Sequence, residues 1–206
     1  MAKGGTKSGS GTVKRRYADL DSGPLGRAHA AHGEAVLRAN PDTVASARAY
    51  SGSSYASIND DLRRGGEPDE VAQRLDKLFA SKDARFQQDS RVYRGMGYND
   101  PIRKALVAGT LRAGDTFTDK GFVSTSVDAD VARGFARNVQ GKPTILRIRA
   151  RKGRRGVHIQ AFSQHPDERE TLLPRGSKFK VRDVTEGVIK GYSSKAPALF
   201  VDVDLM

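Results

Sequence analysis

Two glutamates separated by one residue are the first candidates for chemistry in this sequence. Glu168 and Glu170 lie in residues 167–170, directly before the apolar segment 171–173. If the segment is extended, the two side chains share one face about 7 Å apart, because a strand rises ~3.4 Å per residue. Carboxylates at that spacing can serve one reacting centre, one stabilising positive charge while the other handles a proton. A solvated, charged turn would contain the same residues.

Arg94 ends the short apolar segment 91–94, and Gly95 follows it. An arginine at a strand end can grip a phosphate by paired hydrogen bonds, and the glycine lets a ligand approach the backbone closely. An arginine on a solvated strand end has the same appearance in the sequence. This motif alone therefore does not decide between the two.

Three consecutive hydroxyl side chains, Ser124, Thr125 and Ser126, follow the apolar residues of segment 121–126. Such hydroxyls can satisfy neighbouring strands or cap the helix that follows. A fourth motif lies in residues 55–63, where Asn59 and Arg63 stand four residues apart and so share one helical face. A solvated helix face predicts the same pattern.

The elements that must position these residues change in type along the chain. Apolar spacing and breaker residues predict helices over 27–40 and 68–79, and two short helices within 42–64 that meet at a Ser-Gly-Ser-Ser turn. A further helix is predicted over 128–138. Strands are predicted at 91–94, 121–126, 145–150, 157–159, 171–173, 178–181 and 199–203. Helices first and strands afterwards indicate an α+β domain.

Length and composition restrict the possible classes of protein. A chain of 206 residues predicts one domain, and its hydrophobic content of 37% suffices for a core. We expect a basic flexible arm over residues 1–26 and a single domain over 27–206. No cysteine is present, which excludes disulfides and thiol catalysis, and with only four histidines we expect no metal site. No window is apolar enough for a membrane helix, and the N-terminus lacks the apolar stretch of a secretory signal.

Taken together and in order, the four motifs resemble those of the mono-ADP-ribosyltransferases of the Arg-Ser-Glu class, the bacterial exoenzyme toxins. The resemblance covers about residues 42–185 and rests on Tyr93-Arg94, on Ser124-Thr125-Ser126, on Glu168-Arg169-Glu170 and on the helix at 55–63. It implies N-terminal helices packed on two roughly perpendicular, mainly antiparallel sheets. It also implies that NAD is the substrate, cleaved at the bond between nicotinamide and ribose.

The resemblance implies a role for each catalytic candidate. Glu170 is the catalytic glutamate, which binds the ribose 2′-hydroxyl and stabilises an oxocarbenium-like transition state. Ser124 orients Glu170 and contacts NAD, and Arg94 holds the phosphates. Glu168 engages and deprotonates the acceptor, and a glutamate at this place implies that the acceptor is arginine.

Further contacts with NAD are implied for residues around these motifs. Gly95, Thr125 and Ser126 belong to the same binding segments as Arg94 and Ser124. The adenosine-phosphate half of NAD would meet the predicted helix at 55–63. Phe135 and Arg137 are the nearest candidates for an aromatic and an arginine against nicotinamide and phosphate, although Phe135 also fits a plain helix core. The NAD-binding residues expected from the resemblance are therefore Asn59, Arg63, Arg94, Gly95, Ser124, Thr125, Ser126, Phe135 and Arg137.

The net charge of +12 favours contact with polyanions. The positive charge is densest in residues 147–155, which contain six cations, and the N-terminal arm is a second basic segment. One alternative is therefore a nucleic-acid-binding protein without catalytic activity, and another is an inactive transferase-like scaffold. For the transferase we expect a monomer acting in the cytoplasm of a host or target cell, phage-encoded or injected, without membrane contact. Its target would be a host protein, including one associated with nucleic acid.

Overall fold

The computed structural model describes residues 17–137, 141–190 and 195–206, so the predicted arm lies outside the described residues up to residue 16. The helices are α1 (Gly23–Arg38), α2 (Pro41–Ala49), α3 (Tyr55–Arg64), α4 (Glu70–Ala80), α5 (Pro101–Val107) and α6 (Ala129–Arg137). The strands are β1 (Ala18–Asp19), β2 (Ser90–Gly95), β3 (Thr116–Asp119), β4 (Val123–Ser126), β5 (Thr144–Ala150), β6 (Val157–His158), β7 (Glu170–Leu173), β8 (Ser177–Lys190) and β9 (Lys195–Leu205).

Local sequence signals account for the helix boundaries. A proline lies in the first turn of α1, of α2 and of α5, where its missing N–H costs nothing. Asp69 caps α4 by accepting a hydrogen bond from the backbone N–H of Ala72. Gly65 ends α3 in the left-handed conformation, with φ of 89°. Between α2 and α3 the chain kinks at Gly52, inside the predicted Ser-Gly-Ser-Ser turn.

The predicted helices and strands are confirmed in type, and the elements that were missed are short. The prediction missed β1, α5 and β3, which have two, seven and four residues, too few to display a period. The boundary predicted between arm and domain at residue 26 falls inside α1. Leu20 is also buried ahead of that boundary, so the folded part of the chain begins earlier.

The strands are joined by hydrogen bonds in the order β3-β8-β9-β5-β2-β4-β7-β6, with β1 beside β2. Only β1–β2 and β5–β9 run parallel among the described strands, so the sheet is mainly antiparallel, as predicted. A single register pair, Tyr93 with Ser126, connects β2 to β4 and so links two groups of strands. All strands of the described residues therefore belong to one connected sheet, and the perpendicular arrangement of two sheets stays a prediction.

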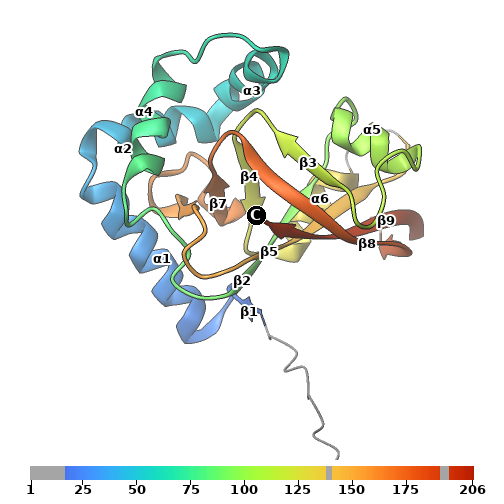
Figure 1. Ribbon diagram of the computed structural model, residues 1–206. Coiled ribbons are helices and arrows are strands. Elements are labelled where there is room, and N and C mark those ends of the chain that lie inside the picture. Colours follow the sequence, from blue (N-terminus) through green and yellow to red (C-terminus); the bar gives the residue numbers. More distant parts are fainter. Residues whose placement is uncertain (1–16, 138–140, 191–194) are drawn as a thin grey trace, which may run out of the picture.

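The helices and strands enclose a hydrophobic core in three parts. Figure 1 shows α1 to α4 gathered on one side of the molecule and the long strands β8 and β9 on the other. One cluster packs helices α1 to α4 against β6 and β7 through residues such as Leu37, Leu75 and Leu172. A second cluster consists mainly of side chains from the strands, and a third packs α6 against β2 and β5. Among the described residues, no helix is both long enough and apolar enough to cross a bilayer.

Candidate active site

A cleft of about 690 Å³ lies between the helical side of the molecule and the strands β2, β4 and β7. All of the site residues predicted from the sequence line it except Arg137, the last residue of α6. The predicted residues that line it are Asn59, Arg63, Arg94, Gly95, Ser124, Thr125, Ser126, Phe135, Glu168 and Glu170. Four motifs that are far apart in the sequence therefore meet around one space.

Strand order explains why three of these residues meet. β4 lies between β2 and β7, so the end of β2 with Arg94, the hydroxyls of β4 and the start of β7 with Glu170 are neighbours. Ser126 is the register partner of Glu170, and the guanidinium of Arg94 donates to the main-chain oxygen of Ser124 at 3.1 Å. The sheet itself thus fixes the spacing between the cation and the acid.

Glu170 is a buried acid at the wall of the cleft, with 5% of its surface exposed. Burial raises the pKa of Glu170 to about 7, because desolvation disfavours the carboxylate. A hydrogen bond from Ser124 and the charge of Arg94 act in the opposite direction, while the charge of Glu168 adds to the rise. With this pKa the carboxyl ionises near neutral pH, and a cationic ligand beside it would favour the carboxylate.

The two glutamates face the cleft for a different reason from the one expected. Glu168 is not in an extended segment: it ends the short helical turn η3 (Pro166–Glu168), and only Glu170 begins the strand. Between them Arg169 adopts the left-handed conformation with φ of 51° and ψ of 47°. The prediction of a shared strand face was therefore wrong, and a tight turn at Arg169 brings both carboxylates to the cleft. Burial also raises the pKa of Glu168.

Two of the three hydroxyls of β4 hold the main chain of the segment that carries the glutamates. The Oγ1 atom of Thr125 donates to the main-chain oxygen of Thr171, and the Oγ of Ser126 donates to that of Glu168 at 2.7 Å. Ser126 also accepts from the N–H of Asp128, just before α6. These hydroxyls therefore have both a structural and a site position. They hydrogen-bond the backbone of the neighbouring segment and of the residue before α6, and they also line the cleft.

Asn59 is engaged by the protein itself. It is buried, its amide nitrogen donates to the hydroxyl of Tyr50 at 2.7 Å, and its amide oxygen accepts from the N–H of Phe122 at 2.8 Å. The Tyr50 hydroxyl lies in turn 3.2 Å from the Oγ of Ser124. A chain of hydrogen bonds therefore connects α3 to Ser124 beside Glu170. Tyr50 and this connection were missed, because nothing local marks a tyrosine as a partner of a residue 74 positions away.

The two arginines of the cleft are also oriented by buried acids. Asp119 binds Arg63 through two hydrogen bonds of 2.9 Å to Nε and Nη2, so the Nη1 side of the guanidinium is the part left for a ligand. Asp100 lies 3.5 Å from Arg94 and caps α5 by accepting from the N–H of Ile102. Both acids were missed, because each lies in a segment without helical or strand periodicity.

Gly95 has a packing role that the sequence analysis did not foresee. A Cβ atom at this position would lie 2.1 Å from the main-chain oxygen of Ala132 in α6. The close approach expected for a ligand is therefore made by a helix, although Gly95 also lines the cleft. A side chain here would push α6, and Phe135 with it, away from the sheet.

Exposed aromatic rings surround the cleft. Phe135 is 47% exposed, so the alternative that it belongs to the helix core is wrong. Tyr55 and Tyr98, at 46% and 49%, also line the cleft and were not among the predicted site residues. Large rings exposed in a concave site are suited to contact with a planar ligand group.

Within the described residues, no group of three or more potential ligands could hold a metal ion.

Fold and site together agree with one class of protein, the transferases that act on a dinucleotide through an Arg-Ser-Glu set of residues. The sequence pattern that defines the ADP-ribosyltransferase exoenzyme family matches residues 28–204. The chain therefore belongs to the ADP-ribosyltransferase exoenzyme family.

Named relatives agree with this assignment. The chain is 34% identical over 142 residues to a Mycobacterium avium protein named "Putative NAD(+)--arginine ADP-ribosyltransferase Mav", and 29% identical over 135 residues to exoenzyme T of Pseudomonas aeruginosa. These matches include 68% and 64% of this chain but only 16% and 27% of the two relatives. The chain thus spans less than a third of either relative.

Solved structures share the fold. An ADP-ribosyltransferase of Clostridium botulinum superposes with a TM-score of 0.71 at 16% identity, over 93% of this chain and 99% of that one. Exoenzyme S of Pseudomonas aeruginosa, solved with human 14-3-3 protein beta and carba-NAD, gives 0.60 at 22% identity, over 85% and 82%.

Proposed function

We propose that this protein is a mono-ADP-ribosyltransferase, which cleaves NAD and transfers ADP-ribose to an arginine side chain of a protein, releasing nicotinamide. The observation that carries the proposal is the buried carboxyl of Glu170, held between Ser124 and Arg94 in the wall of the cleft. Family membership supports the reaction class, and the name of the Mycobacterium avium relative supports arginine as the acceptor.

In the proposed reaction the bond between ribose C1′ and the nicotinamide nitrogen breaks, and positive charge develops on the ribose. Glu170, as a carboxylate, accepts a hydrogen bond from the 2′-hydroxyl and stabilises this charge. NAD already carries a positive charge on its nicotinamide, which favours the ionised form of Glu170, whose pKa is otherwise about 7. Substrate binding would thus convert Glu170 into its active form.

Glu168 would receive the acceptor. Its side chain is half-buried at the cleft and is carried by a turn, so it can meet a side chain that arrives from solvent. An arginine guanidinium must be oriented and must lose a proton as its nitrogen attacks C1′. Glu168 accepts that proton, and the raised pKa of its carboxyl makes the carboxylate a stronger base for this step.

The remainder of NAD is assigned to the cationic part of the cleft. Arg94 and the Nη1 side of Arg63 are suited to the two phosphates. Each guanidinium is positively charged and keeps N–H groups beyond the two that already bond protein oxygens. Phe135 offers an exposed ring for the nicotinamide. Asn59 acts through Tyr50 and Ser124 instead of touching NAD with its bonded groups.

The test is to incubate the protein with NAD labelled in its adenylate part and a cell lysate, and to measure label on protein together with free nicotinamide. Glu170→Gln should lower both by about 100-fold or more, since an electrostatic group at the reacting centre contributes ~3 to 4 kcal/mol. Glu168→Gln should abolish transfer to arginine and leave much of the slow hydrolysis of NAD.

Asp167→Asn is the matched control, because this neighbouring acid is exposed and does not line the cleft. Undiminished label with Glu170→Gln would overturn the assignment of Glu170. Equal loss of transfer and hydrolysis with Glu168→Gln would contradict the division of roles between the two glutamates.

The biological setting of the proposed enzyme follows the expectations from its sequence. The acceptor is a protein of a host or target cell, modified in the cytoplasm by a monomeric enzyme that is phage-encoded or injected. A nucleic-acid-associated protein is the target class that the positive charge favours. Mass spectrometry of labelled lysate proteins identifies the target and the modified residue type.

A further inference from the structure

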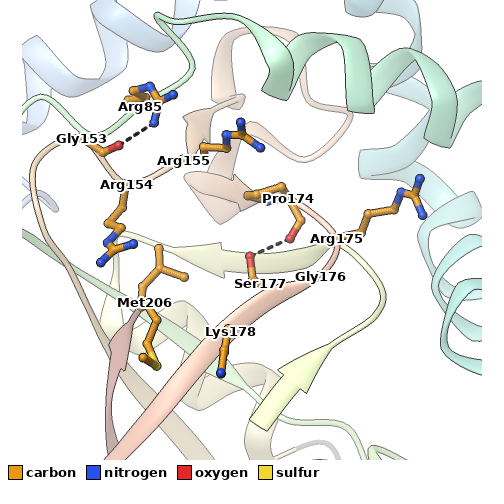
Figure 2. A pocket seen from close by; sticks show the side chains of 11 residues that line it. Arg85, Gly153, Arg154, Arg155, Pro174, Arg175, Gly176, Ser177, Lys178 and Met206 are labelled. Atoms are coloured by element: carbon orange, nitrogen blue, oxygen red, sulfur yellow. Dashed lines mark hydrogen bonds between the residues drawn. The ribbon is translucent and has the colours of Figure 1, made fainter. Parts of the chain in front are cut away.

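A second pocket, of about 310 Å³, lies at the far end of β7 from Glu170 and shares no lining residue with the cleft. It is bordered by the loop between β5 and β6, the turn between β7 and β8, and the end of β9 (Figure 2). Its lining residues with charged side chains are all cationic: Arg85, Arg154, Arg155, Arg175 and Lys178.

The walls of this pocket are held by backbone hydrogen bonds. The N–H of Phe86 donates to the oxygen of Arg154, and the N–H of Gly153 donates to the oxygen of Phe86, both at 2.8 Å. On the other side, the N–H of Met206 donates to the oxygen of Lys178 at 2.9 Å. The cations therefore project from a fixed backbone, so that less conformational entropy of the pocket walls is lost when a ligand binds.

Of the five cations, only Arg175 has an acidic partner among the described residues. Arg85 donates to the oxygen of Gly153, and Arg175 pairs with Asp76 at 2.7 Å. The side chains of Arg154, Arg155 and Lys178 are exposed and make no hydrogen bond or ion pair with any residue that the structure describes. Exposed cations around a hollow whose described lining contains no acidic side chain produce a focused positive potential.

The structure also divides the basic segment 147–155. Arg147 and Arg149 pair with Asp202 and Asp204 of the neighbouring strand β9, at 2.9 Å and 2.8 Å. Their charge is therefore used inside the sheet. In the following loop, Arg154 and Arg155 are exposed and line the pocket, so the capacity for an external polyanion lies there.

The arrangement of the side chains favours an extended ligand. In Figure 2 the cationic groups are spread around the pocket, with Arg154 and Lys178 on either side of Met206 and Arg155 near Pro174. Groups that are spread in this way can contact successive phosphates, and four of the five are arginines, which bind phosphate by paired hydrogen bonds. No aromatic ring lines the pocket within the described residues, so base stacking has no platform here.

We propose that this basic pocket binds the phosphate backbone of a nucleic acid, without sequence preference, as a docking site separate from the cleft. Because β7 has four residues and joins the two sites, the pocket lies roughly 13 Å from Glu170 along the strand at ~3.3 Å per residue. If the proposed transferase function holds, the docked enzyme meets arginines of proteins bound to that nucleic acid.

The test measures binding by fluorescence anisotropy, using fluorescein-labelled RNA and double-stranded DNA of mixed sequence at several salt concentrations. The pocket variant is Arg154→Gln with Arg155→Gln and Lys178→Gln. The control is Arg27→Gln with Arg48→Gln and Lys104→Gln, three exposed cations outside the pocket that lower the net charge equally. The pocket variant should lose about tenfold or more in affinity, and its salt slope should fall by about three, one per phosphate contact. The control should lose less than about threefold.

Equal losses in both variants would overturn the proposal, because the affinity would then come from net charge alone. A polyglutamate peptide that binds as tightly as RNA, with the same sensitivity to the pocket variant, would overturn the choice of nucleic acid in favour of an acidic protein. Cleavage of NAD with a small guanidine acceptor is measured in parallel and should be unchanged in the pocket variant. An enzyme that binds RNA but cleaves no NAD would contradict the proposed function and not the docking site.

Discussion

The hydroxyl of Ser126 donates a hydrogen bond to the main-chain oxygen of Glu168, 42 residues further along the chain, at 2.7 Å. This contact ties β4 to the turn that carries the proposed acceptor-binding glutamate. Ser124, two residues earlier on the same strand, hydrogen-bonds Glu170 instead. One strand therefore supports the two carboxylates through two separate hydroxyls, and this separation can be tested.

Ser126→Ala should lower transfer to arginine more than it lowers hydrolysis of NAD. The substitution leaves the oxygen of Glu168 without its donor, a loss of about 1 to 3 kcal/mol for a buried group, and loosens the turn. Ser124→Ala is the matched change and should lower both reactions together, since it acts on Glu170. Initial rates of transfer and of nicotinamide release decide, and an identical ratio of the two rates in both variants would contradict the prediction.

Arg169→Gly should retain activity, whereas Arg169→Val should lower it. Arg169 is the one residue other than glycine with positive φ in the described part of the chain, and only glycine adopts that conformation without cost. A β-branched residue there costs about 1 to 2 kcal/mol and favours an extended turn that moves Glu168. Both variants lose the ion pair with Asp128, so their difference isolates the backbone. Equal kcat values would refute the role of the turn.

The rate of NAD cleavage at low substrate concentration should rise with pH to a plateau above neutrality, with its midpoint at about pH 7, where half of Glu170 is ionised. The carboxylate is the active form, and the raised pKa means that it is lost as the pH falls through 7. With NAD bound, the cationic nicotinamide should shift this midpoint to lower pH. The midpoint of the kcat profile should therefore lie at a lower pH than the midpoint of the kcat/KM profile. A kcat/KM profile with its midpoint near 4.5 would contradict the burial of the acid.

Glu170→Gln should increase stability at pH 8 although it lowers activity by about 100-fold or more. The pKa of Glu170 is about 7 in the folded protein against 4.5 for an ordinary glutamate, so the folded state loses stability as the pH rises from 4.5 through 7. A neutral glutamine avoids this loss, which amounts to as much as about 3 kcal/mol. Urea unfolding at pH 8 and at about pH 4.5 measures it, and the gain should vanish at the lower pH.

His29 should make the protein sensitive to acid. It is buried against the hydroxyl of Thr171, 3.1 Å away, and His158 contacts the same hydroxyl at 2.9 Å. Burial, together with the charge of His158, lowers the pKa of His29 to about 3. The unfolded chain therefore binds more protons between about pH 6.5 and 3, and stability falls as the pH drops through that range, by on the order of 3 kcal/mol at pH 4.

The comparison for this prediction is the pH dependence of unfolding in His29→Gln. Its stability should depend less on pH between about 6.5 and 4 than that of the unaltered protein. His165→Gln, which alters an exposed histidine, should leave the dependence unchanged. Equal slopes for the protein and both variants would refute the assignment to His29.

Much of the fold and of the site follows from the sequence alone. Apolar periodicity and breaker residues determine α1 to α4, α6 and most strands, because these patterns reflect which face of each element is buried. The order of the four motifs identifies Arg94, Ser124, Glu168 and Glu170, whose side chains all line one cleft. Of the basic residues around the second pocket, the sequence marks only Arg154 and Arg155, as part of segment 147–155, and it does not indicate which cations of that segment are paired.

Tertiary structure decides how these residues are used. The turn at Arg169, the connection from Asn59 through Tyr50 to Ser124, and the pairing of Arg149 with Asp204 join segments whose contacts depend on strand order. The burial that raises the pKa of Glu170 also exists only in the assembled sheet. Local sequence carries periodicity and chain-breaking signals, whereas these contacts arise between distant segments and are set by packing and register.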